Sequence, residues 1–453
     1  MTKKNKKSLF LFRRDLRLED NTGLISALID SEQVIPAFIF DNRQSKNNNP
    51  FFSTNAFEFM IESLNDLNSQ LKAHKKRLFV FEGITEDIIS ELIDREKIDA
   101  VYINKEYTPF GKERDAAIEE ACMKNNVSFK CFPDVLLNEP EYVLKPDGSP
   151  YIVFTSFWKK ASQLPVNKPI KIENHEYTKF YIRNISLEKN IPKYTANPFR
   201  MPGGRSNILK IDFSKFKNYA SVRDYPSIEG TTKMSAHLKF GTISIREAYW
   251  KIVQELTETH SLIRQLYWRD FFYHIAYHFP KVFGKPFNEK FEKIKWEFDE
   301  EKFNAWCNGK TGFPIVDAGM RELNTTGYMH NRVRMIVASF LTKDLHIDWR
   351  LGEKYFAQKL VDYDPCINNG NWQWSASTGC DAQPYFRIFN PWLQQKKFDP
   401  KCEYIKKWVP ELRKVDIQTI HNIYDYSIED YPSPIVDHYV ESKKAIKMYN
   451  ISD

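Results

Sequence analysis

The first 130 residues alternate between two kinds of segment, and this alternation restricts the folds that the chain can adopt. Short apolar or β-branched runs, which are typical of buried strands, lie at residues 9–12, 34–40, 77–81, 100–103 and 127–132. Between them lie amphipathic stretches such as residues 55–71, in which apolar side chains recur near helical spacing. Strands that alternate with helices pair in parallel. We therefore predict an α/β domain over residues 1–132, with a parallel, Rossmann-like sheet.

Proline and turn pairs become frequent after this region, and the periodic pattern weakens. Examples are Pro146-Asp-Gly148 and Pro202-Gly-Gly204. Such a composition is typical of a long connector, which we place at residues 133–205. Helical patterns then return at residues 244–256, 261–279, 318–326 and 329–345. We predict an all-α domain over residues 206–453.

Composition excludes several functional classes. No apolar run reaches the roughly 18 residues that a membrane span needs, and the basic start at residues 1–7 precedes an apolar stretch too short for a signal peptide. The 6 cysteines form no C-x-x-C pair, so we expect neither a zinc site nor disulfides. These features favour a cytoplasmic protein, or a nuclear one in a eukaryote. The net charge of +7 is weakly consistent with a polyanionic partner.

Aromatic residues make up 15% of the chain, and 9 of the 10 tryptophans lie at or beyond position 250. A large aromatic core would explain this enrichment. A pocket lined by rings, for a flat cofactor or for bases, would explain it as well. Composition alone favours the core.

The helix predicted from about Met329 carries an unusual group of polar side chains. Its buried stripe would consist of Val333, Ile336, Val337, Phe340 and Leu341. Asn331, Arg334 and Met335 follow i, i+3 and i+4 spacing, so they share a different face. An amide, a guanidinium and a thioether on one face are unusual for plain core, although packing and surface roles would also explain them.

Two further segments combine polar groups with turn residues. Residues 362–374 carry two aspartates, a glycine and several amides before two tryptophans, and we expect an irregular loop that lines a polar pocket. Arg334 needs a carboxylate if it is buried, and Asp362 is a candidate. Residues 229–235 place small hydroxyl residues before a helical stretch, which suits either phosphate binding or helix capping.

Taken together, these segments resemble the DNA photolyase/cryptochrome family, and the similarity covers nearly the whole chain. The segments that carry it are residues 12–21 (FRRDLRLEDN), 231–241 (TTKMSAHLKFG), 267–271 (YWRDF), 310–317 (KTGFPIVD), 326–335 (TGYMHNRVRM), 368–374 (NNGNWQW) and 377–391 (STGCDAQPYFRIFNP). Within this family, the chain most resembles the class I photolyases that act on cyclobutane pyrimidine dimers.

The resemblance implies FAD, held in a U shape inside the helical domain. Its binding residues would be Tyr219, Thr231, Thr232, Lys233, Met234, Ser235, Arg334, Asp362, Tyr363, Asp364 and Asn368. Arg334 would pair with Asp362, and Asn368 would face the flavin N5. Trp372, Trp349 and Trp296 would pass an electron from the surface to the excited flavin.

The implied activity is that of a deoxyribodipyrimidine photo-lyase, acting as a monomer on DNA that contains pyrimidine dimers. Excited reduced FAD would give an electron to the flipped-out dimer, the ring would split, and the electron would return. Trp268 and Trp374 would sandwich the dimer, while Arg269, Asn331, Arg332, Met335 and Gln394 would contact the lesion or its backbone. We assign catalytic roles to Gln265, Asn331, Met335 and Asn368.

One position departs from the family's pattern. Members that repair cyclobutane dimers usually carry glutamate three residues before the first stacking tryptophan, where this chain has Gln265. Glutamine donates a hydrogen bond but brings neither a charge nor a titratable proton. It resembles relatives that repair (6-4) photoproducts, although those enzymes need histidines where this chain has Asn331 and Met335. The alternatives are therefore (6-4) repair and a cryptochrome-type blue-light receptor.

Residues 104–110 lie where the family docks a second, light-harvesting chromophore. Their sequence does not distinguish methenyltetrahydrofolate from a deazaflavin. The resemblance thus implies an antenna site and leaves its occupant open.

Overall fold

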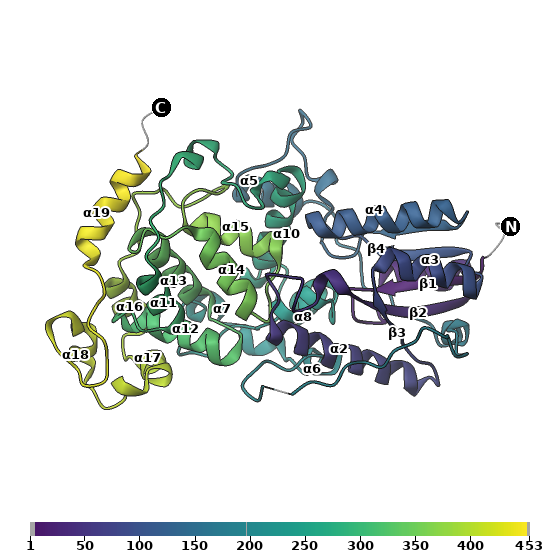
Figure 1. Ribbon diagram of the computed structural model, residues 1–453, viewed down its shortest axis with the longest axis horizontal. Helices are drawn as coiled ribbons and strands as arrows, with labels where there is room; N and C mark the ends of the chain where they lie inside the picture. Colours follow the sequence, from purple (N-terminus) through teal and green to yellow (C-terminus); the bar gives the residue numbers. More distant parts are fainter. Residues whose placement is uncertain (1–4, 196, 451–453) are drawn as a thin grey trace.

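The computed structural model describes residues 5–195 and 197–450, and Figure 1 shows two regions side by side along its long axis. The first region holds a five-stranded sheet in the order β3-β2-β1-β4-β5, and all neighbouring strands are parallel. Its strands are β1 (Asn5–Phe12), β2 (Ser31–Asp41), β3 (Phe79–Gly83), β4 (Ala100–Asn104) and β5 (Ser128–Phe132). Its helices are α1 (Thr22–Asp30), η1 (Asn42–Gln44), α2 (Thr54–Ala73), α3 (Thr85–Glu96) and α4 (Pro109–Lys124). The predicted parallel α/β sheet is confirmed.

Side chains of β1 alternate between the two faces of the sheet, and helices cover both faces. Phe10 and Phe12 pack into one core with α1 and α2, whereas Leu9 and Leu11 pack into another with α3 and α4. Because β1 and β4 are parallel neighbours, their carboxyl ends lie at the same edge. The loop after β1 and the segment 105–110 therefore leave the sheet side by side.

Residues 133–204 run over both regions. Tyr181 N donates to the Val34 carbonyl of β2 at 2.8 Å, and Leu137 N donates to Asp270 of the helical region at 2.8 Å. Short helices interrupt this stretch at η2 (Pro140–Tyr142), α5 (Phe154–Ala161) and η3 (Asn174–Lys179).

The second region consists of helices. The longer ones are α9 (Ile245–Glu255), α10 (Ser261–His278), α11 (Glu300–Asn308), α12 (Pro314–Thr326), α13 (Asn331–Lys343), α14 (Trp349–Lys359), α15 (Pro365–Ser375) and α19 (His438–Tyr449). The shorter ones are α6 (Arg205–Ile208), η4 (Phe213–Phe216), α7 (Tyr219–Val222), α8 (Ser235–Phe240), η5 (Pro280–Val282), η6 (Glu289–Lys293), α16 (Pro391–Phe398), α17 (Glu403–Trp408), η7 (Pro410–Leu412), α18 (Ile417–His421) and η8 (Ile423–Asp425). The apolar stripe predicted on α13 is buried. None of the helices described is long and apolar enough to cross a membrane.

The prediction of an irregular loop at residues 362–374 is wrong for most of that segment, because residues from Pro365 onward form α15. Asp364 caps this helix by accepting from the N–H groups of Cys366 and Ile367 at 3.1 and 3.3 Å. Pro365 takes the first helical position, where its missing N–H has no intrahelical acceptor to lose. The glycine and amides that follow obscured this helix start. The polar residues of the segment therefore project from a rigid helix.

A buried ion-pair network joins the two regions. Asp134 accepts from Arg17, in the loop after β1, at 2.6 Å and from Arg246 of α9 at 2.8 Å. Arg246 also donates to Asp20 at 2.9 Å. Arg17 and Asp134 are almost completely buried, so each charge depends on its partners.

We expect Asp134→Ala to lower the free energy of unfolding by about 3–5 kcal/mol, because two arginines lose their shared carboxylate. Burial would raise the pKa of Asp134, but the charges of Arg17 and Arg246 outweigh it and hold that pKa below its usual value. The stabilisation is therefore present above about pH 4 and is lost as the pH falls through the lowered pKa. Denaturant unfolding at neutral and acid pH measures both effects. Replacing the exposed Glu120 by alanine is the control, and equal stability of the two variants at neutral pH would contradict the expectation.

Candidate active site

Arg334 and Asp362 form the centre of the candidate site. Arg334 of α13 donates through Nη2 to Oδ2 of Asp362 at 2.9 Å and through Nε to the Met329 carbonyl at 2.8 Å. Ser235, the first residue of α8, donates to the same Asp362 oxygen at 2.5 Å. The sequence predicts this arginine–aspartate pair. The other Asp362 oxygen, Oδ1, is buried and accepts from no described residue.

Asp364 is held by a residue that the sequence analysis missed. Arg14, from the loop after β1, forms an ion pair with Oδ2 of Asp364, and Tyr273 of α10 donates to that oxygen at 2.5 Å. Burial would raise the pKa of Asp364, but the charges of Arg14 and Arg269 outweigh it, and the pKa lies below its usual value. Arg14 belongs to the segment 12–21, so this family motif was the one sequence signal that could have pointed to its role. The ion pair between Arg14 and Asp364 joins the α/β region to the start of α15.

Asn368 lies one turn after Asp364 on α15. Its Nδ2 is buried and donates to no described residue. An unsatisfied buried donor costs free energy unless a ligand accepts from it. Neighbouring Asn369 points its own Nδ2 toward Glu353 of α14, at 3.5 Å from Oε2.

Residues 229–235 form the turn that precedes α8. This helix has Met234 as its N-cap and no side-chain cap, so the helix-capping interpretation is wrong and phosphate binding stays a prediction. Lys233 has a left-handed backbone with φ of 52° and pairs with Glu229 at 2.7 Å. Of the two predicted tyrosines, Tyr219 is buried on α7, and Tyr363 stacks on Phe51 with ring centroids 6.3 Å apart.

The three predicted electron-transfer tryptophans differ in burial. Trp372 of α15 and Trp349 of α14 are 2% and 1% exposed, whereas Trp296 is partly exposed and packs against the same core. Trp296 also contacts Tyr449 of α19, with ring centroids 6.0 Å apart. A further tryptophan, Trp306, lies 6.3 Å from Trp372 between ring centroids and is not in the predicted set.

Trp268 packs against an aromatic side chain that the segment 267–271 did not reveal. Phe154 of α5 stacks on it with centroids 3.6 Å apart and an interplanar angle of 7°. Phe271 and Phe272 also contact the indole, with ring centroids 5.8 and 5.7 Å away. Trp268 nevertheless stays partly exposed. Gln265, one turn earlier on α10, and Trp374 of α15 are both partly exposed.

The polar face of α13 presents Asn331 and Met335 together. Asn331 is exposed, and its Nδ2 lies 3.9 Å from the Met335 sulfur. The adjacent Arg332 pairs with Asp224 at 2.8 Å and lies over the Phe398 ring at 4.4 Å.

Two other predicted DNA contacts have different surroundings. Gln394 of α16 is partly buried, and its Oε1 has no hydrogen-bond partner among the described residues. Arg269 is buried and donates to the Val135 carbonyl at 2.7 Å. This guanidinium is turned toward the connector, so we do not propose Arg269 as a DNA contact.

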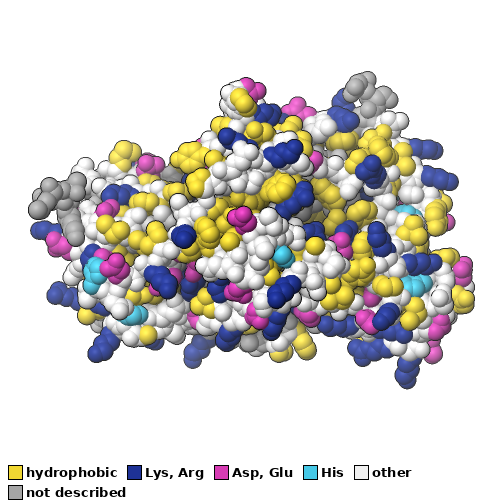
Figure 2. Space-filling model, turned by 180° about the vertical axis from the view of Figure 1, so that it is seen from behind, with side chains coloured by type: hydrophobic (Ala, Val, Ile, Leu, Met, Phe, Trp, Pro, Cys, Tyr) yellow, Lys and Arg dark blue, Asp and Glu magenta, His cyan; other side chains and the backbone are white. Residues whose placement is uncertain are grey.

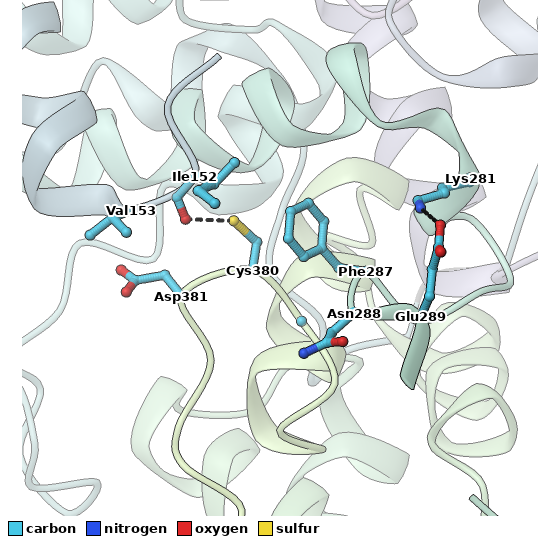
Figure 3. A pocket seen from close by; sticks show the side chains of 9 residues that line it. Ile152, Val153, Lys281, Phe287, Asn288, Glu289, Cys380 and Asp381 are labelled. Carbon is cyan, nitrogen blue, oxygen red and sulfur yellow. Dashed lines mark hydrogen bonds and ion pairs between the residues drawn. The ribbon is translucent and has the colours of Figure 1, made fainter. Parts of the chain in front are cut away.

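An open hollow of about 480 Å³ lies between the connector and the segment after α15. Figure 3 shows Ile152 and Val153 on one side of the hollow and Phe287 on the other. The Cys380 thiol donates a hydrogen bond to the Ile152 carbonyl. Asp381 also lines the hollow and accepts from the N–H of Phe154 at 3.1 Å. The hollow therefore adjoins the Phe154–Trp268 stack.

Comparison with known proteins identifies the family. Residues 8–172 match DNA photolyase, and residues 262–451 match the FAD binding domain of DNA photolyase. A deoxyribodipyrimidine photo-lyase of Alkalihalophilus pseudofirmus is 37% identical over 470 residues, covering 98% of this chain and 97% of that protein. The chain belongs to the DNA photolyase family.

Solved structures give the same result. An archaeal photolyase from Sulfolobus tokodaii, solved with two FAD molecules, is 44% identical with a TM-score of 0.88, covering 98% of this chain and 99% of that one. A cryptochrome from Synechocystis is 27% identical, also with a TM-score of 0.88, covering 99% of this chain and 100% of that one. The predicted architecture of an α/β region followed by a helical FAD-binding domain is confirmed.

The residues of the helical region fit FAD. Asp362 Oδ1 is a buried acceptor and Asn368 Nδ2 a buried donor, and neither has a described protein partner. Asp362 lies in the short loop before α15, and Asn368 lies in the first turn of that helix. An unpaired acceptor and an unpaired donor so close in sequence suit a polar cofactor that has both donors and acceptors.

Proposed function

We propose that this protein repairs cyclobutane pyrimidine dimers in DNA by a light-dependent reaction. The observation that carries the proposal is the pair Asn331 and Met335, side by side on the polar face of α13. Both side chains are uncharged and neither titrates, whereas repair of a (6-4) photoproduct in this family needs histidines at these positions. Splitting a cyclobutane ring requires an electron and no acid, so an amide and a thioether suit this substrate.

FAD would be held between α8, α13 and α15. Asp362 would accept through Oδ1, Asn368 would donate through Nδ2, and the turn at 231–235 would face the phosphates. Bound reduced FAD supplies, on absorbing light, the electron that splits the dimer and is then regained. Arg334 and Arg14 would hold the two aspartates in place through their ion pairs, which is the protein's contribution to orientation.

An electron would reach the excited flavin through Trp372, Trp349 and Trp296. The order of burial supports this route, because the first two rings are enclosed and Trp296 reaches the surface. Indoles are the most easily oxidised rings among the protein side chains, and all three lie in or against the same hydrophobic core.

The dimer would leave the duplex and stack between Trp374 and the part of the Trp268 ring that stays exposed. Extruding bases costs a few kcal/mol, and less at a lesion that is already poorly stacked, while each stacked base regains about 1–3 kcal/mol. The Phe154 stack supports this role, because it holds the Trp268 ring in one orientation. Lysine and arginine side chains are spread around a central apolar area on the face drawn in Figure 2, and such cations would supply the salt-dependent part of DNA binding.

The antenna would lie at residues 104–110. Phe110 is flanked by the guanidinium groups of Arg43 and Arg114, at 5.3 and 5.6 Å from its ring centre. Cations over a ring mark a place where flat, electron-rich groups bind well. The likeness to the Sulfolobus tokodaii photolyase, which was solved with two FAD molecules, supports a second flavin rather than a folate or a deazaflavin. Chromatography of the chromophores released from purified protein would identify the occupant.

Two defined oligonucleotides test the choice of substrate. We expect the photoreduced protein to repair an oligonucleotide with one cyclobutane thymine dimer and to leave its (6-4) counterpart unchanged. Gln265→Glu should keep this choice, because the proposal assigns it to the Asn331–Met335 pair of α13, which this change on α10 leaves in place. Repair of the (6-4) substrate alone would reverse the assignment. No repair of either, with flavin bound and reducible, would favour a blue-light receptor.

A further inference from the structure

Asp224 is a carboxylate that has no part in the function proposed above. It lies two residues after the end of α7, opposite the first turn of α13. Its Oδ1 lies 2.8 Å from Nη2 of Arg332, a residue that the family resemblance predicts to contact the lesion or its backbone. A carboxylate of the protein therefore pairs with a cation that is expected to meet DNA phosphates.

The Arg332 side chain is packed against α16 and does not extend into solvent. Its backbone N–H donates to Nδ1 of His330, the N-cap residue of α13, at 3.2 Å. Its guanidinium lies over the ring of the buried Phe398, the last residue of α16, at 4.4 Å from the ring centre. Only 17% of the side chain is exposed. A duplex lying on the surface therefore meets little of this cation.

The hydrogen bonds of the ion pair are incomplete. Nε of Arg332 is buried and donates to no described residue, and Oδ1 of Asp224 is buried without a well-directed hydrogen bond from the described residues. The Asp224 side chain is 32% exposed, so solvent screens the pair and its contribution to stability is modest. Arg223 lies farther from the same oxygen, with its Nε at 3.8 Å. Asp224 and Phe398 thus restrain Arg332 without locking it in place.

We propose that Asp224 is a specificity-determining residue, which keeps Arg332 folded back from an intact duplex and reserves it for the backbone of an extruded dimer. A guanidinium binds carboxylate and phosphate oxygens in the same way, so Asp224 takes the place of a phosphate in the free protein. The inference rests on the proposed function, because it requires a lesion that is flipped toward Asn331 and Met335.

The discrimination follows from the position of the cation. To reach the phosphates of an intact duplex on the surface, Arg332 has to leave both Asp224 and the Phe398 ring. An extruded dimer brings its own phosphates toward Asn331, the preceding residue of α13, and Arg332 meets them without extending. Nε of Arg332, unpartnered in the free protein, then gains an acceptor. An intact duplex therefore makes one phosphate contact fewer than a damaged one.

DNA binding in the dark, measured over a range of salt concentrations, tests the proposal. The probes are two duplexes of one sequence, with and without a single cyclobutane thymine dimer. Each phosphate that a cation neutralises contributes about 0.9 to the slope of log affinity against log salt concentration. We expect Asp224→Asn to steepen the slope for the intact duplex by about one and to tighten its binding roughly two- to fivefold. The slope for the damaged duplex should stay unchanged, so the preference for the lesion falls.

Two further variants assign the effect to this ion pair. Arg332→Ala should flatten the slope for the damaged duplex by about one and leave the slope for the intact duplex unchanged. In the Arg332→Ala background, Asp224→Asn should have no further effect. Glu188→Gln is the matched control, because it removes the same charge from a pair of similar exposure, that of Glu188 with Arg77 beside β3. It should alter neither slope.

An unchanged slope for the intact duplex in Asp224→Asn would overturn the proposal. A change that persists in the Arg332→Ala background would overturn it as well, because Arg223 or net charge would then be responsible. If Asp224→Asn failed to fold, Arg332→Ala would decide alone: flattening for the damaged duplex only supports the proposal, and equal flattening for both overturns it. A natural chain that bound both duplexes equally well would refute the proposed function instead.

Discussion

Trp372→Phe is expected to slow photoreduction of the bound flavin by at least about tenfold, equivalent to about 1.4 kcal/mol in the barrier. Phenylalanine fits the space between Gly352 and Phe356, but its ring does not give up an electron under these conditions. Repair by protein that has been reduced chemically beforehand should be nearly unchanged, because in the proposed site the dimer stacks on Trp374 and not on Trp372. Time-resolved absorption under blue light measures the first quantity, and single-turnover repair measures the second.

Trp306→Phe provides a matched control. Trp306 is fully buried, its ring lies 6.3 Å from Trp372 between centroids, and its indole N–H donates to the Val337 carbonyl at 3.0 Å. Its loss removes the same kind of ring from the same core but leaves the proposed route intact. We expect lower stability and nearly normal photoreduction. Equal slowing in both variants would show that core packing, and not the identity of Trp372, controls electron transfer.

Asp362→Ala is expected to remove most of the FAD and to destabilise the helical region by about 3 kcal/mol, the lower end of the range for a buried pair because Arg334 is partly exposed. The change deprives Arg334 and Ser235 of their shared acceptor and removes the unpaired Oδ1. The ratio of flavin to protein after gel filtration measures retention, and thermal unfolding of the flavin-free chains measures stability.

Asp362→Asn separates the two effects. It keeps the shape and one acceptor oxygen but loses the charge, so its flavin content should lie between those of Asp362→Ala and the natural chain. Full retention of FAD by Asp362→Ala would contradict the role assigned to this residue, whatever the change in stability.

The α/β region could be predicted well because short apolar runs mark its strands and apolar side chains at helical spacing mark its helices. Most of β1 to β4 is buried on both faces and reads as apolar runs, whereas the edge strand β5 is partly exposed. Helix α2 carries a regular apolar stripe after the Ser53 cap. Helix α15 was missed because Asp364 combines a cap with an ion pair to Arg14, and the residues between the cap and Trp372 are poor helix formers.

In the candidate site, too, some contacts could be predicted from the sequence and others could not. The Arg334–Asp362 pair was predictable, since a buried guanidinium needs a carboxylate and Asp362 begins the polar segment 362–374. Contacts between distant segments were not, because no periodic pattern records them: Phe154 on Trp268, Arg14 on Asp364, and Glu353 beside Asn369. Such contacts arise from how the connector and the two regions pack.

Light-dependent reversal of a defined lesion tests the central claim most directly. An oligonucleotide with a single cyclobutane thymine dimer is mixed with protein whose flavin has been reduced, and one half is illuminated with blue light while the other stays dark. We expect conversion to the undamaged oligonucleotide in the light and none in the dark. An unchanged dimer in the illuminated sample, with reduced flavin still bound and the DNA still held, would contradict it.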